Sequence, residues 1–267
     1  SKCKGVQTID CIDSNYLWSN YTYFSGQNNG IIEHQKEVAK YIANRFNFNE
    51  SPVVIDIGSN DGTLLHAFKR IGFNVFGVDP AETVAKVAIK AGIETHIGLF
   101  SDRSVEKFPS RYKNADLITA FNVFAHSDDM QGMINGVNLL LKEKGIFCFE
   151  VQYLKSILDK NLLGTIFHEH MIHYSVTSAK EFLENNGLRL FDLMENNIQK
   201  GSIIFFACKE INDIPISQSV TFMLDLEKNE GYTDGFRFEK FNKFISDEKQ
   251  NINRLLSKYK KAKYTIA

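Results

Sequence analysis

Short apolar runs alternate with amphipathic stretches over residues 53–151, and this alternation is the strongest pattern in the chain. The apolar runs have the length of strands: Val53–Ile57, Asn74–Asp79, Asp116–Phe121 and Gly145–Val151, with another expected before Gly98. The stretches between them place apolar residues at helical spacing: Thr63–Ile71, Ala81–Ala91 and Met130–Lys142. Nearly continuous apolar strands joined by helices indicate a parallel sheet that is covered on both faces.

This rhythm changes after residue 151. A helix is predicted at Ser178–Asn186, and two strands follow at Arg189–Met194 and Ser202–Lys209. The connection between these strands is short enough for a hairpin, which predicts an antiparallel final strand. The expected fold class is therefore α/β, with a doubly wound, mostly parallel sheet and an antiparallel last strand.

The patterns divide the chain into three segments. Residues 1–50 combine an aromatic-rich stretch with a helix from Ile31 to Phe46, residues 51–210 form the core, and residues 211–267 are predicted to be helical. Helical spacing in the last segment rests on Phe238, Phe241, Ile245, Ile252, Leu255 and Tyr259. Because the chain starts with Ser1 and stops at Ala267 within a new apolar run, we expect a truncated chain, in which the last helix of residues 211–267 either docks on the core or leads into a further domain.

Composition and charge narrow the class of protein. With 267 residues, 43% hydrophobic and 24% charged, the chain suits a globular domain with a smaller attachment. A net charge of −1 provides no basic field, which argues against nucleic acid as a partner. The longest apolar run, Ile203–Cys208, is too short to span a membrane. The first residues given do not show the charged-then-apolar pattern of a secretory signal, and Cys148 and Cys208 lie in apolar runs as small buried residues would, so a cytoplasmic protein is expected.

A glycine loop, Asp56–Thr63, lies between the first predicted strand and helix. Its pattern of acid-x-Gly-x-x-x-Gly fits neither the dinucleotide fingerprint nor the phosphate-binding loop. Asp79 ends the second strand, where an acid in a doubly wound sheet reaches the hydroxyls of a ribose. The alternative is a structural turn followed by a helix-capping aspartate.

Three further stretches follow strands at the same edge of the sheet, where ligands of open α/β sheets bind. They are Gly98–Phe100, Asn122–His126 and Glu150–Tyr153. His126 is therefore placed to contact a substrate, and a solvated loop histidine is the alternative.

Four histidines fall in a histidine window between residues 126 and 173: His126, His168, His170 and His173. A zincin helix site would need a histidine at position 172, where Ile172 stands, and a metal site from His168, His170 and His173 is geometrically awkward, so no metal is expected. Glu169 beside His170 suits a different task, because a carboxylate can orient an imidazole or raise its basicity as a general base.

The glycine loop followed by Gly77–Pro80 resembles the class I S-adenosylmethionine (SAM) methyltransferases. The resemblance implies a Rossmann-like, seven-stranded sheet and SAM as cofactor, with the glycine loop at its methionine part and the later acid at its ribose. It implies the following cofactor-binding residues: Asp56, Gly58, Ser59, Asn60, Gly62, Thr63, Asp79, Pro80, Leu99, Phe100, Asn122 and Val123.

A second resemblance concerns Ile166–Ser175, which is similar to the Tyr-x-Glu-His-x-x-x-x-Ser signature of C-methyltransferases acting on nucleotide-linked 4-keto-deoxysugars. Three other stretches resemble that family's lid, its glycine turn and the end of its zinc module: Tyr21–Ser25, Lys200–Ser202 and Cys3–Gln7. The resemblance implies that His170, with Glu169, removes a proton next to a ketone to give an enolate. It implies that His126 and Tyr153 hold the sugar or stabilise the enolate oxygen, and it adds substrate or lid residues: Tyr21, Tyr23, Phe167, His168 and His173.

The chain departs from that family in three places. Phe167 replaces the usual tyrosine and so removes a hydroxyl. Cys3 and Cys11 cannot close a four-ligand zinc site, so zinc is expected only if a missing amino-terminal module is present. The family's carboxy-terminal domain would begin about where this chain stops, so the chain is either cut or a shorter relative with another substrate.

Three functions follow from these observations. The first is carbon methylation of a nucleotide-linked 4-keto-deoxysugar for surface polysaccharide or secondary metabolite synthesis. The second is O-methylation of a sugar or a surface-glycan precursor, with His170 removing a hydroxyl proton. The third is a SAM-binding domain without catalysis. The expected partner is thus a small nucleotide-sugar or glycan substrate, and the sequence leaves the oligomeric state open.

Overall fold

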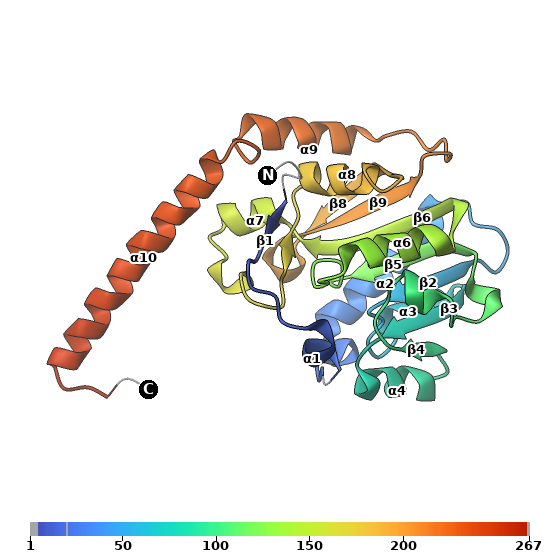
Figure 1. The fold of residues 1–267 in the computed structure, drawn as a ribbon, viewed down its shortest axis with the longest axis horizontal. Helices are drawn as coiled ribbons and strands as arrows, with labels where there is room; N and C mark the ends of the chain where they lie inside the picture. Colours follow the sequence, from blue (N-terminus) through green and yellow to red (C-terminus); the bar gives the residue numbers. More distant parts are fainter. Residues whose placement is uncertain (1–4, 20, 266–267) are drawn as a thin grey trace.

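Seven strands form one central sheet in the order β4-β3-β2-β5-β6-β9-β8 (Figure 1). We obtained a computed structural model that describes residues 5–19 and 21–265. The strands are β2 (Val53–Ile57), β3 (Asn74–Asp79), β4 (Thr95–Ile97), β5 (Ala115–Phe121), β6 (Leu141–Gln152), β8 (Leu188–Asn196) and β9 (Ser202–Lys209). Neighbouring strands pair in parallel from β4 through β3, β2 and β5 to β6. Strand β9 is antiparallel to both of its neighbours, β6 and β8. The predicted fold class is confirmed, and the antiparallel last strand lies inside the sheet rather than at its edge.

Helices cover both faces of this sheet, as the continuous apolar strands predicted. They are α2 (Asn29–Arg45), α3 (Thr63–Arg70), α4 (Glu82–Lys90), α5 (Asp102–Val105), α6 (Met130–Leu140), α8 (Val176–Glu184) and α9 (Gln218–Asn229). Successive residues of β2 point to opposite faces, so Val54 belongs to the apolar core formed with α2 and α3, while Ile55 belongs to the core that includes residues of α6, α8 and α9. Each face therefore has its own apolar core.

Local hydrogen bonds explain where helix α2 begins. The side chain of Asn28 accepts hydrogen bonds from the backbone N–H groups of Gly30 and Ile31, so the helix begins at Asn29, slightly before the predicted Ile31.

Helix α6 ends earlier than predicted. Leu141 already pairs with Ala115 in the sheet, so α6 ends at Leu140 rather than at Lys142.

The amino-terminal segment contains elements that the sequence did not indicate. Strand β1 (Val6–Gln7) pairs with β7 (Ile172–His173), and the short helix α1 (Ser14–Trp18) follows. Cys3 of the zinc-module resemblance lies outside the described residues, and Cys11 is exposed. Within residues 5–19 and 21–265, no group of three or more histidine, cysteine or acidic side chains could hold a metal ion.

The helical carboxy-terminal segment consists of α9 and the long α10 (Phe236–Lys261). Phe241 at the start of α10 packs against α7 (Leu154–Asp159), and from there the helix runs away from the sheet (Figure 1). Ile252, Leu255 and Tyr259 on its distal part are exposed. Over the part of the chain that the structure describes, no helix combines the length and apolar character needed to cross a membrane.

Short 3-10 turns complete the described chain: η1 (Ser25–Gln27), η2 (Ser110–Tyr112), η3 (Leu163–Thr165) and η4 (Ile198–Lys200). The turn η4 joins β8 to β9 as the predicted hairpin connection. Cys148 and Cys208 are buried and unbridged, as their apolar surroundings predicted.

Candidate active site

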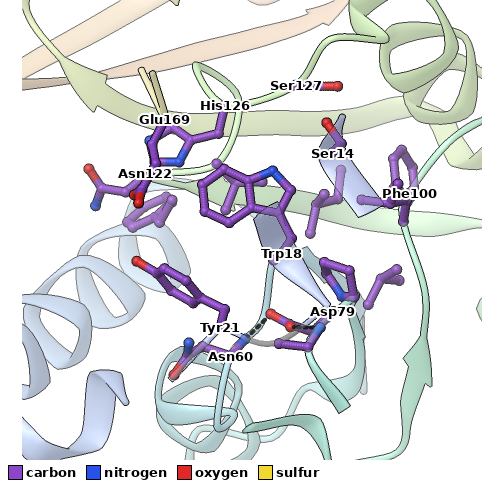
Figure 2. A pocket seen from close by; sticks show the side chains of 18 of the residues that line it. Ser14, Trp18, Tyr21, Asn60, Asp79, Phe100, Asn122, His126, Ser127 and Glu169 are labelled. Carbon is purple, nitrogen blue, oxygen red and sulfur yellow. Dashed lines mark hydrogen bonds between the residues drawn. The ribbon is translucent and has the colours of Figure 1, made fainter. Parts of the chain in front are cut away.

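A cavity of about 460 Å³ lies at the carboxyl ends of the parallel strands (Figure 2). Ile57, Asp79 and Phe121, at the ends of β2, β3 and β5, contribute to its wall. Its volume falls in the range of about 300–1,000 Å³ that is typical of small-molecule sites. The cavity therefore occupies the place where doubly wound sheets bind their ligands.

The glycine loop forms one wall of the cavity through its backbone. Gly58 has φ +68°, and its N–H donates to the carbonyl of Val78 at 2.7 Å. A Cβ atom at this position would lie 2.2 Å from Cγ2 of Val123. Only glycine fits both the left-handed backbone and this close approach.

Asp79 is fixed by the backbone and faces the cavity. Its two carboxylate oxygens accept hydrogen bonds from the N–H groups of Asn60 and Ala81, each at 2.8 Å (Figure 2). Burial raises the pKa of Asp79, and the two N–H donors oppose this rise. Because a carboxylate has about four acceptor positions, two remain for the hydroxyls of a ribose.

The structure divides the predicted cofactor residues into two groups. Eight of them line the cavity: Gly58, Asn60, Asp79, Pro80, Leu99, Phe100, Asn122 and Val123. The other four do not line it, and for these the expectation of direct contact is corrected: Asp56, Ser59, Gly62 and Thr63. Their geometry shows that they shape the loop instead.

Each of these four residues points into the protein or begins the helix. Asp56 accepts a hydrogen bond from Oγ1 of Thr119 at 2.6 Å, and burial raises its pKa to about 7. Ser59 faces Gly77, Gly62 is the left-handed residue before α3, and the Thr63 hydroxyl donates to Asp61. They thus hold the turn between β2 and α3.

The aromatic segment closes on the glycine loop. The N–H groups of Ser25 and Gly26 donate to the side chains of Asn60 and Asp61 at 2.9 and 2.8 Å. The Asn60 amide in turn donates to the carbonyl of Tyr23 at 2.9 Å. Tyr21 and Tyr23 line the cavity, where the lid resemblance placed them.

Trp18 is a cavity residue that the sequence analysis missed. Its ring stacks on His126 with the ring centroids 5.3 Å apart, and Figure 2 shows it between His126 and Asp79. The hydroxyl of Ser14, on the same helix α1, donates to Asp128 at 2.7 Å and ties the helix to the opposite wall. The available signal was that Trp18, the one tryptophan of the chain, belongs to the aromatic-rich stretch of residues 1–50.

Gln35 and Gln199 also line the cavity without a sequence signal. Gln199 lies in the turn η4 and has φ +51°, followed by Lys200 with φ +67°. Such strained backbone often marks a functional position. Gln199 reaches the cavity from a hairpin that follows the histidine window in the sequence.

Four of the predicted catalytic and substrate residues meet on the far wall: His126, Phe167, Glu169 and His170. The imidazoles of His126 and His170 have centroids 4.9 Å apart. Nδ1 of His170 lies 2.6 Å from the carbonyl oxygen of Thr165. A carbonyl only accepts, so Nδ1 carries the proton and Nε2 of the neutral ring has a free lone pair.

Burial keeps these imidazoles neutral. It lowers the pKa of His170, while the hydrogen bond to Thr165 and the charge of Glu169 oppose the change. For His126, burial and the neighbouring histidines His170 and His173 lower the pKa to about 3. Near neutral pH the histidines of this wall are therefore uncharged, as a proton acceptor must be.

Three predicted residues do not reach the cavity, and their expected roles are corrected. Tyr153 is 0% exposed, and its hydroxyl donates to Glu227 at 2.8 Å inside the protein. His168 is exposed and does not line the cavity, whereas His173 is buried and lines a second, much smaller cavity behind the wall. The position of Tyr153 follows from the alternation of side chains along a strand. Phe149, Val151 and Tyr153 are two residues apart, so they point to the same face and share one apolar core.

The fold and the site define a class of protein. A doubly wound sheet with one antiparallel strand inserted between β6 and β8, a glycine loop against Val78 and a buried acid at the ribose position are the features of class I SAM-dependent methyltransferases. The apolar residues beyond Asp79 provide a slot for a flat ring: Leu99, Phe100 and Met133. These residues fit SAM.

The comparison with known proteins gives the family. The chain belongs to the Methyltransferase domain family, whose profile matches residues 31–193. It is 33% identical over 245 residues to the C-methyltransferase NovU of Streptomyces niveus, which covers 92% of this chain and 58% of that protein. It is 26% identical over 151 residues to the ubiquinone biosynthesis O-methyltransferase of Coxiella burnetii, covering 52% of this chain and 64% of that one. The chain thus spans about three fifths of the length of these relatives.

Solved structures support the fold. Magnesium protoporphyrin IX methyltransferase of Synechocystis PCC 6803, solved with bound SAH, superposes with a TM-score of 0.52 at 15% identity. The superposition covers 68% of this chain and 84% of that one.

Proposed function

We propose that this protein transfers the methyl group of SAM to a carbon of a nucleotide-linked 4-keto-deoxysugar. The observation that carries the proposal is the hydrogen bond from Nδ1 of His170 to Thr165, which leaves Nε2 as an unprotonated base in the cavity that Asp79 and the glycine loop also line. The 33% identity to a C-methyltransferase over 92% of this chain supports a carbon as the methyl acceptor.

The proposed reaction begins with proton removal at His170. The C–H bond next to the ketone breaks, its proton passes to Nε2, and its electron pair becomes the carbon–carbon double bond of an enolate. SAM supplies an electrophilic methyl group on a sulfonium sulfur, which a carbon nucleophile can accept. The net change replaces one hydrogen of the sugar by methyl, breaks the bond between that methyl group and the sulfonium sulfur, and releases one proton and S-adenosylhomocysteine.

The walls around His170 suit this step. His126 lies beside it and, as a neutral imidazole, offers an N–H donor for the oxygen on which negative charge develops. The ring centroid of Phe167 lies 4.5 Å from that of His170. Phe167 lacks the hydroxyl of the family's tyrosine, but its apolar ring still covers the base. Trp18 closes the other side of His126 and limits access of water.

The test is hydrogen exchange in heavy water with a nucleoside-diphosphate 4-keto-6-deoxyhexose. We expect the protein to introduce deuterium at the carbon next to the ketone faster than an enzyme-free control, and a His170→Gln variant to match that control. Methyl transfer to the same sugar carbon, detected by mass spectrometry and NMR, completes the test. Methyl transfer without exchange above the control contradicts the enolate step.

O-methylation is the second candidate, because a neutral His170 could equally take the proton of a hydroxyl. The similarity to an O-methyltransferase favours it, although at 26% identity and over 52% of the chain. The position of the new methyl group on carbon or oxygen separates the two reactions. If wild-type protein binds SAM and methylates neither position, the domain is a SAM-binding module instead.

A further inference from the structure

A second cavity of about 10 Å³ lies directly behind the histidine wall. His126, His170, Asn122 and Gln199 line both cavities, so these side chains form the partition between them. His173 and Gln152 line only the small one. The small cavity is thus in contact with the proposed base but lies outside the space for cofactor and substrate.

Two polar atoms in this cavity have no hydrogen-bond partner among the described residues. They are Nε2 of His173 and Oε1 of Gln152, and both are buried. His173 is only 5% exposed, and its backbone pairs with Val6 across β1 and β7. Buried polar groups nearly always have a partner, so two orphans at one cavity indicate a bound polar ligand.

The Gln152 side chain has a defined orientation. Its amide nitrogen donates to the carbonyl oxygen of Gln199 at 3.1 Å, and that oxygen can only accept. The other amide atom, Oε1, is therefore the acceptor at the cavity. The strained turn that places Gln199 here, with φ +51°, thereby also fixes Gln152.

We propose that the small cavity binds one water molecule that bridges Nε2 of His173 and Oε1 of Gln152 and contacts the His126–His170 pair. A buried water needs a volume of about 10–15 Å³ and two to four polar partners, and the cavity provides both. Water both donates and accepts, so it satisfies Gln152 and either tautomer of His173. A metal ion fits less well, because no set of three or more ligating side chains is found in the described parts of the chain.

The water gives His173 and Gln152 a positioning role at the active site. It uses two of its about four hydrogen-bonding directions on them and keeps the others for His126, so that Nε2 of His170 stays available to the substrate. It also provides local solvation for the charged form of His170. The charged and titratable groups around His170 are Glu169 on the same loop, His126 and His173, and Tyr21 of the lid interacts with Glu169. The water site stands on geometry alone, whereas its catalytic role rests on the proposed function.

A high-resolution crystal structure of the wild-type protein tests the site. We expect one density peak at about 2.7–3.2 Å from both Nε2 of His173 and Oε1 of Gln152. The peak should remain in His173→Gln, which keeps a polar group, and be absent in His173→Phe. A cavity without density, or a peak with metal-like anomalous signal, overturns the proposal.

The positioning role is tested by the titration of His170, followed by NMR of ¹⁵N-labelled histidine in the SAM-bound protein. We expect His173→Phe and Gln152→Leu to lower the His170 midpoint by about 1 pH unit, because the charged form loses its solvation. His173→Gln should restore it. The control is His66→Phe on α3, outside both cavities, which should leave the midpoint unchanged.

The same variants connect the site to catalysis. His173→Phe should lower kcat about tenfold without changing SAM affinity, and His173→Gln should recover most of the loss. An unchanged His170 midpoint in both His173→Phe and Gln152→Leu overturns the role. The crystal structure and the titration need no sugar, so they decide this proposal even if the proposed substrate proves wrong.

Discussion

The two halves of the large cavity are built in different ways. The cofactor half consists of Gly58, Asn60 and Asp79, which are held by backbone hydrogen bonds within one strand–loop–helix–strand unit. The histidine half collects side chains from separate parts of the chain: α1, the loop after β5, the loop before β7 and the turn η4. The first half is thus fixed by local backbone geometry and the second by tertiary packing.

This difference determines how each half should respond to mutation. In the cofactor half a side chain added to the backbone does the damage, because the loop must approach its ligand closely. In the histidine half the loss of a side chain does the damage, because chemistry and shape depend on the side chains themselves. The contrast between the two halves is wrong if an added side chain does no harm in the cofactor half, or if the loss of a side chain does no harm in the histidine half.

The largest effect is expected at His170. Replacement by Gln keeps the polar volume but removes the base, so kcat/KM for methyl transfer should fall about 10²- to 10⁴-fold. SAM affinity, measured by isothermal titration calorimetry, should stay within about twofold, because the cofactor half is built independently. The matched control is His168→Gln, which changes an exposed imidazole outside the cavity and should retain activity.

The pH profile sharpens this prediction. His170 acts only as the neutral imidazole, so activity should fall as the pH drops through its pKa. Because burial lowers that pKa from its ordinary value of 6.5, the acid limb of kcat/KM should lie below pH 6.5. An acid limb clearly above 6.5 would show that His170 is not the titrating base.

The next effect is expected at Gly58 in the cofactor half. Gly58→Ala places a Cβ 2.2 Å from Val123 and at φ +68°, so the loop must shift. Strain of about 1–3 kcal/mol corresponds to roughly a tenfold to hundredfold loss of SAM affinity if the shift displaces the loop from the cofactor. Isothermal titration calorimetry with SAM measures it.

Gly72→Ala is the matched control. Gly72 also has a positive φ, +97°, but nothing lies within 4 Å of the added Cβ. It should lower the melting temperature and leave SAM affinity unchanged. Equal losses of affinity in both variants would show that general destabilisation, not the close approach at Gly58, weakens binding.

The same difference explains how much the sequence could predict. The alternation of strands and helices, the glycine loop and Asp79 follow from patterns within neighbouring segments, and all were predicted near their observed positions. The order of the strands in the sheet was not predicted. Trp18 could not be placed, because its contact with His126 arises when α1 folds across the cavity. The same holds for Gln199, whose position depends on the pairing of β9 between β6 and β8.

Two wrong expectations have simple physical reasons. Tyr153 was expected at the site because it follows a parallel strand, but the alternation of side chains along β6 directs it into the core with Val151. Asp56 was expected at the cofactor because it opens the glycine loop, but the hydroxyl of Thr119 on the neighbouring strand holds it below the loop. Side-chain direction, rather than position along the chain, decided both cases.

A smaller effect is expected at Trp18. Aromatic pairs contribute about 0.5–1.5 kcal/mol beyond buried area, so Trp18→Ala should lower kcat/KM by up to about tenfold, and Trp18→Phe by less. The SAM affinity of each variant, measured alongside kcat/KM, shows whether the cofactor half has changed as well. Tyr16→Ala is the control, because Tyr16 lies on the same helix and is 79% exposed. If Tyr16→Ala and Trp18→Ala lose activity equally, α1 acts through its fold and not through the stacked ring.

The smallest effect on activity is expected at Tyr153, which tests its corrected role. Its hydroxyl is one of several donors to the buried carboxylate of Glu227, which also accepts the N–H groups of Val176 and Thr177 at the start of α8. Tyr153→Phe leaves this carboxylate with one donor fewer, so we expect the free energy of unfolding to fall by about 1–3 kcal/mol, measured by chemical denaturation. Methyl transfer should stay within about twofold of wild type, since the hydroxyl does not reach the cavity. If Tyr153→Phe instead keeps the stability of wild type and strongly reduces kcat, the Tyr153 hydroxyl takes part in the reaction. The histidine half would then include a residue that does not line the cavity.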